Sequence, residues 1–451
     1  MFKNYCRRLK LFKKAILILS LIMLSPCVFA VDRKELNVDF FNKFNDPYLY
    51  QYINEALENN HSAKQATQRV EQYRQGVKAS LGKELPSLSV GANYLGTHTP
   101  NLGNMGNFNI DESVFVMPLI ASWEADFLLK NRDKTKSAKK SYEISQQEEK
   151  AIYLALLTDV ATVYTNILQY DELIKNQEQI LKNSENLYSA NQKRFERGVI
   201  DNTILNDSEN TILDAKNNLE SLTKQREILL MQLAVLTGKS SYCANNQERG
   251  TLDNFEYQAT IPDEIQSDII FARPDVQAAE KKLEKAKIDV RVARKELFPR
   301  FNITGIWAFS TLTGGSFFSW ESSLAALLGG ATLDLFKGGQ KKANLKLYKA
   351  KYEELFENYK QVDLEAVKEV NTALCIVKHD TLTDEYSKTK LENQQKNFTD
   401  SQKKLNRGVI SNPEYLIEQT KLLNQEQETA NTKAQRLVNY YTLYKATGGG
   451  I

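Results

Sequence analysis

Apolar residues recur every seven positions along one long stretch of the chain. The repeated positions are Val160, Ile167, Ile174, Leu181, Tyr188 and Phe195, with Leu156, Val163 and Tyr170 beside them on the same side. A seven-residue apolar period is typical of a helix that packs along a single seam. No proline stands between residues 130 and 196. The pattern therefore predicts one continuous helix of about 100 Å, at a rise of 1.5 Å per residue.

The same pattern returns 210 residues further along the chain. Its apolar positions recur as Val370, Val377, Asp384, Leu391, Phe398 and Leu405, with one polar interruption at Asp384. The stretch QKRFERGVI at 192–200 is answered by QKKLNRGVI at 402–410, and Thr237-Gly238 by Thr447-Gly448. This duplication predicts a tandem repeat. Each copy should consist of helix, strand, loop, strand, long helix, tight turn and helix.

Four short segments alternate in polarity instead of repeating every seven residues. We expect strands at about 86–95, 114–126, 299–310 and 322–335, with turn-forming residues between the members of each pair. A strand of about ten residues can cross a bilayer when tilted. Four strands cannot close on themselves, and lipid does not tolerate open sheet edges. Three copies of the chain would supply twelve strands and close a barrel.

The N-terminus has the composition of an export signal. Six basic residues precede an uncharged apolar run at 15–24, and Val28-Phe29-Ala30 forms a small-residue cleavage site. We therefore expect residues 1–30 to be removed. A lipoprotein signal ending at Cys27 is the alternative, but Pro26 occupies a position where that signal normally has Gly or Ala.

The remaining chain divides at the boundaries of the two copies. We expect an N-terminal extension at 31–47, a first repeat at 48–240, a linker at 241–267 and a second repeat with a C-terminal tail at 268–451. Without the signal, 53 basic residues stand against 56 acidic ones, which gives no footprint for nucleic acid. Cys243 and Cys375 could pair after export, but two buried, unpaired thiols are the simpler expectation.

Several motifs, in a fixed order, resemble one family of proteins. They are RPDVQAAE at 273–280, LFPRFNITG at 297–305, WEADF at 123–127, GGQ at 338–340 and the two RGVI turns. Together they resemble outer membrane factors of the TolC and OprM type, and within these the NodT-like efflux branch. Asp334 and Lys337 depart from that branch, where Pro and Asp are frequent.

The resemblance implies both a fold and a set of partners. The fold would be mainly α with transmembrane β: a tandem-repeat protomer of a homotrimer, whose 12-stranded β-barrel continues into a long α-helical periplasmic barrel, with residues 241–267 near its equator. The protein would lie in the cell outer membrane, in contact with its lipid. It would conduct cargo passively from an inner-membrane pump of the RND or ABC type, through a periplasmic membrane-fusion adaptor, without a cofactor.

The two tight turns are the sharpest candidate sites. A glycine between two helices suits a left-handed helix end, and a bare structural turn would explain the glycine alone. The duplicated neighbours exceed what a turn requires, so with the resemblance they favour adaptor contact. These candidate residues are Arg197, Gly198, Val199 and Ile200, and in the second copy Arg407, Gly408, Val409 and Ile410.

Glu414 is the candidate for a constriction at the tunnel entrance. In the resembled family, acidic residues just beyond the second turn ring the entrance, and three such carboxylates around an axis would bind cations. The match is incomplete because Ile417 stands where a second acidic residue is expected. A solvated glutamate at a helix start, favoured by the helix dipole, is the equal alternative.

Other functions find less support in the sequence. The three histidines, His61, His98 and His379, have no metal-ligand spacing, and no phosphate-binding glycine motif follows a strand. We therefore do not expect an enzyme or a metal site. The serious alternative is a periplasmic coiled-coil adaptor or spacer, which would not need the strands. The cargo cannot be read from the sequence.

Overall fold

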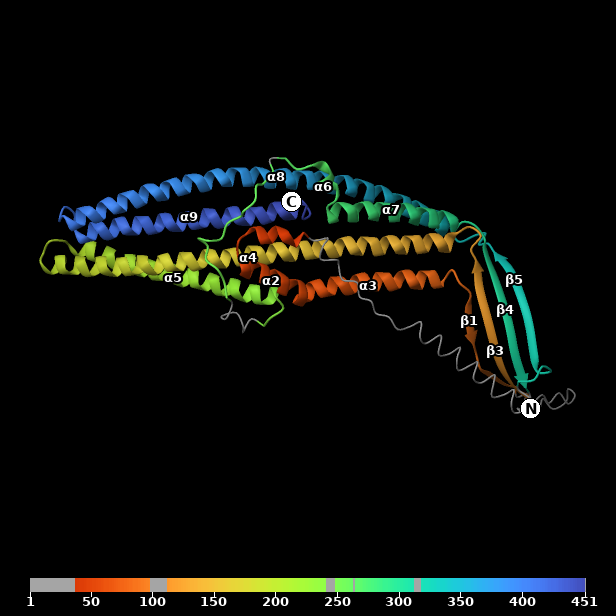
Figure 1. The fold of residues 1–451 in the computed structure, drawn as a ribbon. Coiled ribbons are helices and arrows are strands. Elements are labelled where there is room, and N and C mark those ends of the chain that lie inside the picture. Colours follow the sequence, from red (N-terminus) through yellow and green to blue (C-terminus); the bar gives the residue numbers. More distant parts are fainter. Residues whose placement is uncertain (1–36, 98–111, 241–247, 263, 312–317, 451) are drawn as a thin grey trace.

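The computed structural model describes residues 37–97, 112–240, 248–262, 264–311 and 318–450. The expected signal segment at 1–30, Cys27, His98 and Cys243 lie outside these residues. The described chain forms a long rod of helices with a curved sheet at one end (Figure 1). The expected mixed fold, mainly helical with one small sheet, is confirmed.

The two repeats have matching elements, which the sequence anticipates from the offset of 210. The first contains α2 (Pro47–Asn59), α3 (His61–Gly82), β1 (Ser87–Val90), β2 (Asn93–Thr97), β3 (Glu112–Ala125), α4 (Lys130–Glu196) and α5 (Asn202–Leu236). The second contains α6 (Ser267–Phe271), α7 (Pro274–Lys295), β4 (Arg300–Thr311), β5 (Ser323–Thr332), α8 (Gln340–Asn406) and α9 (Asn412–Ala446). Helices α4 and α8 each contain 67 residues, and α5 and α9 each contain 35.

The strands form one antiparallel sheet in the order β1-β3-β4-β5, with β2 continuing the β1 edge. The hairpin of the first repeat is joined to that of the second through β3 and β4, where Leu119 lies opposite Trp307. Within the described chain, β1 and β2 form one edge of the sheet and β5 forms the other. Both edges are unpaired in a single protomer.

The expected strand at 86–95 is divided into β1 and β2, and Pro118 on β3 is the reason. The register is the same on both sides of the break, since Val90 lies opposite Leu119 and Asn93 opposite Val116. Gly91 still donates its backbone N–H to Pro118 O at 2.9 Å. Proline has no N–H to return a bond, so the ladder is interrupted there without a shift in pairing.

Helix α4 forms the core of the rod. It packs against α2, α3, α5, α7 and α9, and 28 of its 67 residues are buried. The seam expected at Val160, Ile167 and Ile174 is buried, whereas Phe195 near the tip is exposed. One window of α4 is apolar and long enough to cross a membrane, but 67% of it is buried inside the protein. It therefore serves as a core helix.

The start of the described chain is packed into the middle of the rod. The short helix η2 (Val38–Lys43) places Phe40 and Phe41 in the core, and the Phe40 ring stacks on Tyr444 of α9 at 4.4 Å. Asn37 Nδ2 also donates to Gly449 O at 3.0 Å. Residues 37–46 are thus bound to the end of α9, which the sequence pattern did not indicate.

Asp384 interrupts the second seam, and the structure explains how it is accommodated. Its side chain is almost fully buried, and Oδ2 lies 3.0 Å from Lys388 Nζ and 3.3 Å from Arg436 Nη1. Arg436 and Lys388 also lie near Glu256, in the segment that connects the two repeats. A buried charge is tolerated when it is paired, so the interruption joins α8, α9 and the connecting segment.

Cys375 contradicts the expectation of two buried thiols. It is a free, exposed cysteine on α8. Val370, Ala373 and Val377 form the buried side of this helix. Cys375 lies two residues from both Ala373 and Val377, a spacing that rotates it about 200° away from that side. The heptad positions alone already place Cys375 outside the buried seam of α8.

Removing Arg436 should destabilise the protein more than removing the whole ion pair. We expect Arg436→Met to lower stability by about 3 kcal/mol, because Asp384 would remain buried with one exposed partner. Replacing both, with Asp384→Ile and Arg436→Met, should restore stability to within about 1 kcal/mol, because an apolar seam needs no charge partner. Thermal unfolding of the detergent-purified chain measures both.

Lys388→Met is the matched control for this pair. Lys388 is about half exposed, so its loss should cost less than about 1 kcal/mol. Equal destabilisation by Arg436→Met and by the double variant would contradict the pairing argument.

Candidate functional site

The first tip turn is a helix end of a defined type. Val199 N–H donates to Arg194 O at 2.9 Å, and Gly198 N–H donates to Phe195 O at 2.8 Å. Gly198 has φ 71°, the left-handed conformation that this pair of hydrogen bonds requires. A Cβ placed on Gly198 would meet no atom within 4 Å. The glycine is therefore required by its backbone angle and not by lack of space.

The second tip repeats this geometry. Val409 donates to Lys404 O and Gly408 to Leu405 O, both at 2.9 Å, and Gly408 has φ 72°. The return helices are capped by different residues: Asp201 accepts the Ile204 N–H at 3.1 Å, and Ser411 caps α9. The duplicated RGVI sequence thus encodes two nearly identical turns.

Both turns present apolar side chains to solvent at the same end of the rod. Val199 is 62% exposed and Val409 69% exposed. Arg197 and Arg407 are exposed, and Ile200 and Ile410 are half-buried. The two tips lie side by side at the end farthest from the sheet (Figure 1). All eight candidate residues therefore form one terminal surface.

Glu414 helps to cap the start of helix α9. Ser411 donates its backbone N–H to Glu414 Oε2 at 2.7 Å and its hydroxyl to the same oxygen at 2.8 Å. Glu414 N–H returns a bond to Ser411 Oγ at 3.5 Å, which completes a capping box. The backbone hydrogen bond from Ser411 contributes most to holding the pKa of Glu414 below its usual range. The carboxylate is ionised, exposed and held at the helix start.

At the opposite end of the rod, the sheet has two different faces. The alternation and the strand register place a continuous apolar set on one face. This set consists of Leu88, Val90, Tyr94, Phe115, Met117, Leu119, Trp123, Phe301, Ile303, Trp307, Phe309 and Leu327. The other face carries Ser87, Ser89, Asn93, Ser122, Glu124, Asn302, Thr304 and Thr332, together with some apolar residues. The first face can contact lipid and the second can line water.

Aromatic residues gather at both ends of the apolar face. Trp123 lies at the end nearest the helices, close to the contact between Phe127 and Phe301, whose rings are 5.2 Å apart. Phe115 lies eight residues from Trp123 along β3. At about 3.3 Å per residue, this separation is about 26 Å along the strand, which matches the length of a tilted transmembrane strand. Aromatic residues at both borders are typical of such barrels.

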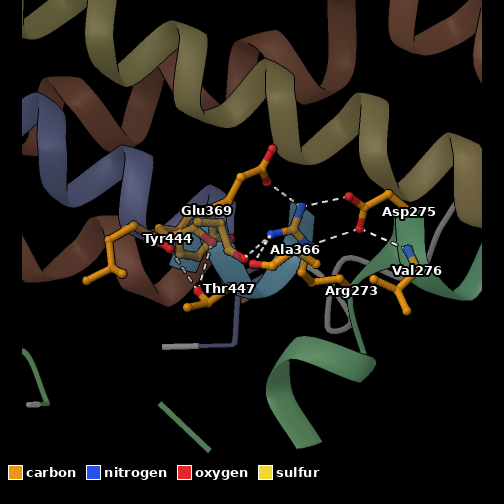
Figure 2. Close-up of polar contacts among 9 residues, drawn as sticks. Arg273, Asp275, Val276, Ala366, Glu369, Tyr444 and Thr447 are labelled. Atoms are coloured by element: carbon orange, nitrogen blue, oxygen red, sulfur yellow. Dashed lines mark hydrogen bonds and ion pairs between the residues drawn. The ribbon is translucent and has the colours of Figure 1, made fainter. Parts of the chain in front are cut away.

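A buried arginine fixes the middle of the rod, and sequence reasoning assigned it no role. Arg273 is 6% exposed and precedes α7. Its guanidinium binds both oxygens of Asp275, at 3.0 and 2.7 Å, and Glu369 Oε2 at 2.6 Å (Figure 2). Nη1 donates to Ala446 O at 2.8 Å. The side chain therefore connects the start of α7, the middle of α8 and the end of α9.

This arginine cluster also depends on the chain that follows α9. Gly448 has φ 65°, and a Cβ there would lie 3.2 Å from Arg273 Cα. Burial would raise the pKa of Asp275, but the hydrogen bonds and charge of Arg273 outweigh it and hold that pKa below its usual range. The RPD motif and the duplicated Thr-Gly were visible in the sequence. Their contact was not, because 173 residues separate Arg273 from Ala446.

No group of three or more metal-ligating side chains occurs among the residues that the structure describes. The histidines on described segments, His61 and His379, lie on α3 and α8 respectively. The described part of the chain thus has a sheet with one apolar face at one end and two exposed, duplicated turns at the other.

The comparisons with known proteins agree with this geometry. The family model described as "Outer membrane efflux protein" matches residues 52–239 and 267–449, one match for each repeat. The chain is 25% identical to the probable outer membrane lipoprotein SilC of Salmonella typhimurium, over 91% of this chain and 87% of that protein. It is also 25% identical to the cation efflux system protein CusC of Escherichia coli O157:H7, over 90% and 87% respectively.

A solved structure shares the fold over most of the chain. The Campylobacter jejuni CmeC outer membrane channel superposes with a TM-score of 0.84 at 22% identity, covering 92% of this chain and 88% of that one. The alternative of an adaptor or spacer does not account for the sheet or for these matches. The family model covers both repeats of the chain, and the chain therefore belongs to the outer membrane efflux protein family.

Proposed function

We propose that three copies of this chain form one continuous exit duct, a twelve-stranded barrel in the outer membrane above a twelve-helix periplasmic tunnel. The observation that carries the proposal is that each protomer has two open sides that complement each other. In this proposal the duct conducts cargo passively, and the energy for transport comes from the pump to which it is connected.

The open edges of the sheet match through the repeat. In the protomer, β3 pairs with β4, the first strand of the next repeat. The counterpart of β3 is β5, and the counterpart of β4 is the β1 strand. The free edge of β5 can therefore pair with β1 of the next copy in the same way that β3 pairs with β4. Such pairing removes every open edge, which lipid requires.

The helices have the same incomplete symmetry. One side of α4 binds α7: Ser137 Oγ donates to Asp289 at 2.6 Å, and Lys140 binds Glu284 at 2.7 Å. The equivalent positions on α8 are Leu347 and Ala350, both exposed, and Leu347 is 58% exposed. Only 7 of the 67 residues of α8 are buried, against 28 in α4. The counterpart of α7 is α3, so α3 of the next copy would cover this side.

Three copies of the chain would pair every open sheet edge and also cover the exposed side of every α8 helix. Each protomer contributes four strand positions around the barrel and four helices, α3, α4, α7 and α8, around the tunnel. Twelve strands leave a lumen wider than the eight-stranded barrels that side chains fill. Closed rotational symmetry then repeats one heterologous interface three times.

A disulfide placed across the proposed interface should link protomers. Helices α3 and α7 align by their last residues, Gly82 and Lys295, so Asp289 corresponds to Gly76. The repeat therefore relates the contact of Ser137 with Asp289 to a contact of Leu347 with Gly76 of the next copy. We expect Leu347→Cys combined with Gly76→Cys, in a background with Cys375→Ser and Cys243→Ser, to give covalent dimers and trimers on non-reducing gels.

Lys346→Cys with Gly76→Cys is the matched control for this crosslink. Position 346 lies about 100° around α8 from Leu347 and should not reach Gly76. Monomers only from Leu347→Cys, or equal crosslinking from both pairs, would refute the proposed interface.

The tips complete the proposal as the docking end. Two exposed valines on rigid, duplicated turns, flanked by Arg197 and Arg407, form an apolar surface with a basic rim. Such a surface suits a protein partner with apolar and acidic residues. We propose that a periplasmic adaptor binds here and connects the duct to an inner-membrane pump of the RND or ABC type. In this arrangement cargo selection belongs to the pump.

A charge at either tip should prevent adaptor binding. We expect Val199→Asp and Val409→Asp to abolish crosslinking to the adaptor and to lower efflux at least tenfold, because a carboxylate would be desolvated in an apolar contact. Val199→Thr and Val409→Thr keep the shape of valine and add no charge, so these variants should retain most of the adaptor crosslinking and most of the efflux. The docking assignment is wrong if the aspartate variants still crosslink while trimers persist.

We also propose that Glu414 narrows the tunnel entrance electrostatically. Three copies of an ionised carboxylate, held by a capping box, would form a ring around the axis that attracts cations. The capping geometry supports this because it fixes the carboxylate at the helix start without neutralising it.

Glu414→Gln separates this role from the structural one. Glutamine also forms a capping box, so α9 should remain as stable while the charge is lost. We expect multivalent-cation block of single-channel current to weaken about tenfold in Glu414→Gln. Unchanged block would remove the ring and leave Glu414 as a helix cap.

A further inference from the structure

Below the apolar face of the sheet, two helices carry matching basic side chains. Arg132, Lys136 and Lys139 lie one turn apart on the first turns of α4, and Lys342, Lys346 and Lys349 occupy the equivalent positions of α8. We call these six residues the basic collar. All six are exposed. The offset of 210 relates every member of one set to a member of the other.

The collar cations are mostly without carboxylate partners. Among the collar residues, all of which lie in the described part of the chain, only Lys136 forms an ion pair, with Asp133 at 3.8 Å. Neighbouring cations on other sides of the same helices are paired: Lys140 binds Glu143 and Glu284, and Lys341 binds Asp334. Unpaired, closely spaced cations repel one another. Their duplication indicates that an anionic partner outside the protomer offsets this repulsion.

The side of the rod to which the collar side chains point can be inferred from the two faces of the sheet. Lys130 binds Glu124, and Glu124 shares a face with Asn302, the polar face of the sheet. At 100° per residue, Arg132 and Lys139 point to the side of α4 opposite Lys130. That side continues the apolar face, which carries Trp123 and its pair Ile303. In the proposed barrel, the collar therefore faces outward and not into the lumen.

The collar also lies at a defined depth. On each helix its members lie within eight residues, about 10 Å, in the first turns after the strands end. The members nearest the sheet, Arg132 and Lys342, follow the strand ends at Ala125 and Thr332 by seven and ten residues. Along the same helix side, the next positions are Glu143 and Glu353, so the sign of the charge reverses one turn further from the membrane. If these basic residues were only a solvated helix face, there would be no reason for them to be confined to the turns nearest the sheet.

We propose that the basic collar binds the anionic headgroups of phospholipids in the periplasmic leaflet of the outer membrane. Unpaired lysines and arginines close to a membrane surface attract anionic lipid, and the attraction accumulates with each cation. Three protomers would present eighteen such side chains around the duct. The collar would fix the depth of the barrel and resist its movement when a pump pulls on the tips.

The test is native mass spectrometry of the full-length, detergent-purified trimer after exchange with mixed phosphatidylglycerol and phosphatidylethanolamine. We expect the wild type to retain phosphatidylglycerol preferentially. Replacing all six collar residues by glutamine should lower this preference at least about tenfold. The wild-type preference should also weaken in 1 M salt, where the Debye length is about 3 Å.

A matched control replaces six other exposed lysines, away from the sheet, by glutamine. These are Lys182, Lys216, Lys224, Lys368, Lys378 and Lys396. The control should keep the lipid preference. If the sixfold collar variant does not assemble, the two threefold variants, one on each helix, should each lose a substantial part of the preference.

Three results would overturn the proposal. An unchanged lipid preference in the collar variant, or an equal loss in the control, would show that the collar is not the binding surface. Loss of binding to isolated cell-wall sacculi with lipid preference intact would assign the collar to an anionic glycan. A changed ion selectivity of the channel with unchanged lipid preference would place the collar in the lumen.

This inference rests on the barrel proposed above, with its apolar face outward. The two failures are distinguishable by particle shape. If the barrel proposal is wrong, the wild type will not form a threefold particle. If only the collar proposal is wrong, intact trimers will show no preference that depends on the six residues.

Discussion

Unpaired backbone groups at the two edges of the sheet are the constraint on which the rest of this protein depends. A strand edge exposes N–H and C=O groups that cannot be left unbonded in hydrocarbon. The β1 and β5 edges of one protomer are open, and they correspond to the two strands that already pair at β3 and β4. The same requirement extends to the helices, since the side of α8 that carries Leu347 lacks the neighbour that α4 has. Oligomerisation is therefore part of the fold.

A rod of this length also needs cross-connections that a small globular domain does not. Long helices can slide or bend along their seams because each heptad resembles the next. The structure concentrates its specific contacts near the middle of the rod: the Arg273 cluster, the paired Asp384, and the aromatic side chains of residues 37–46 packed on α9. These contacts fix register and join the ends of the two repeats. Both halves of the rod then extend from one rigid centre.

The two ends of the rod use different chemistry for different surroundings. At the sheet, aromatic and aliphatic side chains cover one face over the length that a tilted transmembrane strand needs, and the basic collar follows on α4 and α8. At the tips, two turns closed by left-handed glycines hold exposed valines in place. A rigid turn loses little conformational entropy when a partner binds, which favours docking by a small surface.

The sequence by itself determined the repeat, the helical rod, the four strand positions and the two tip turns. Heptad spacing, alternation and a glycine between helices are local signals, so they can be read without knowing what packs against what. Local signals also suggested a family, which the match over both repeats confirms. Local signals were less reliable for features that depend on contacts between elements. Cys375 is exposed where a buried thiol was expected, and the strand expected at 86–95 is interrupted because a proline lies opposite it on β3.

Only the tertiary structure decided which distant residues meet. The contact of Arg273 with the end of α9 spans 173 positions, and Asn37 reaches Gly449 across 412. The capping box showed that Glu414 is already held by Ser411. The side of α4 to which its basic residues point followed from the pairing of Lys130 with Glu124. Such relations depend on how elements are placed in space, and no pattern along the chain encodes them locally.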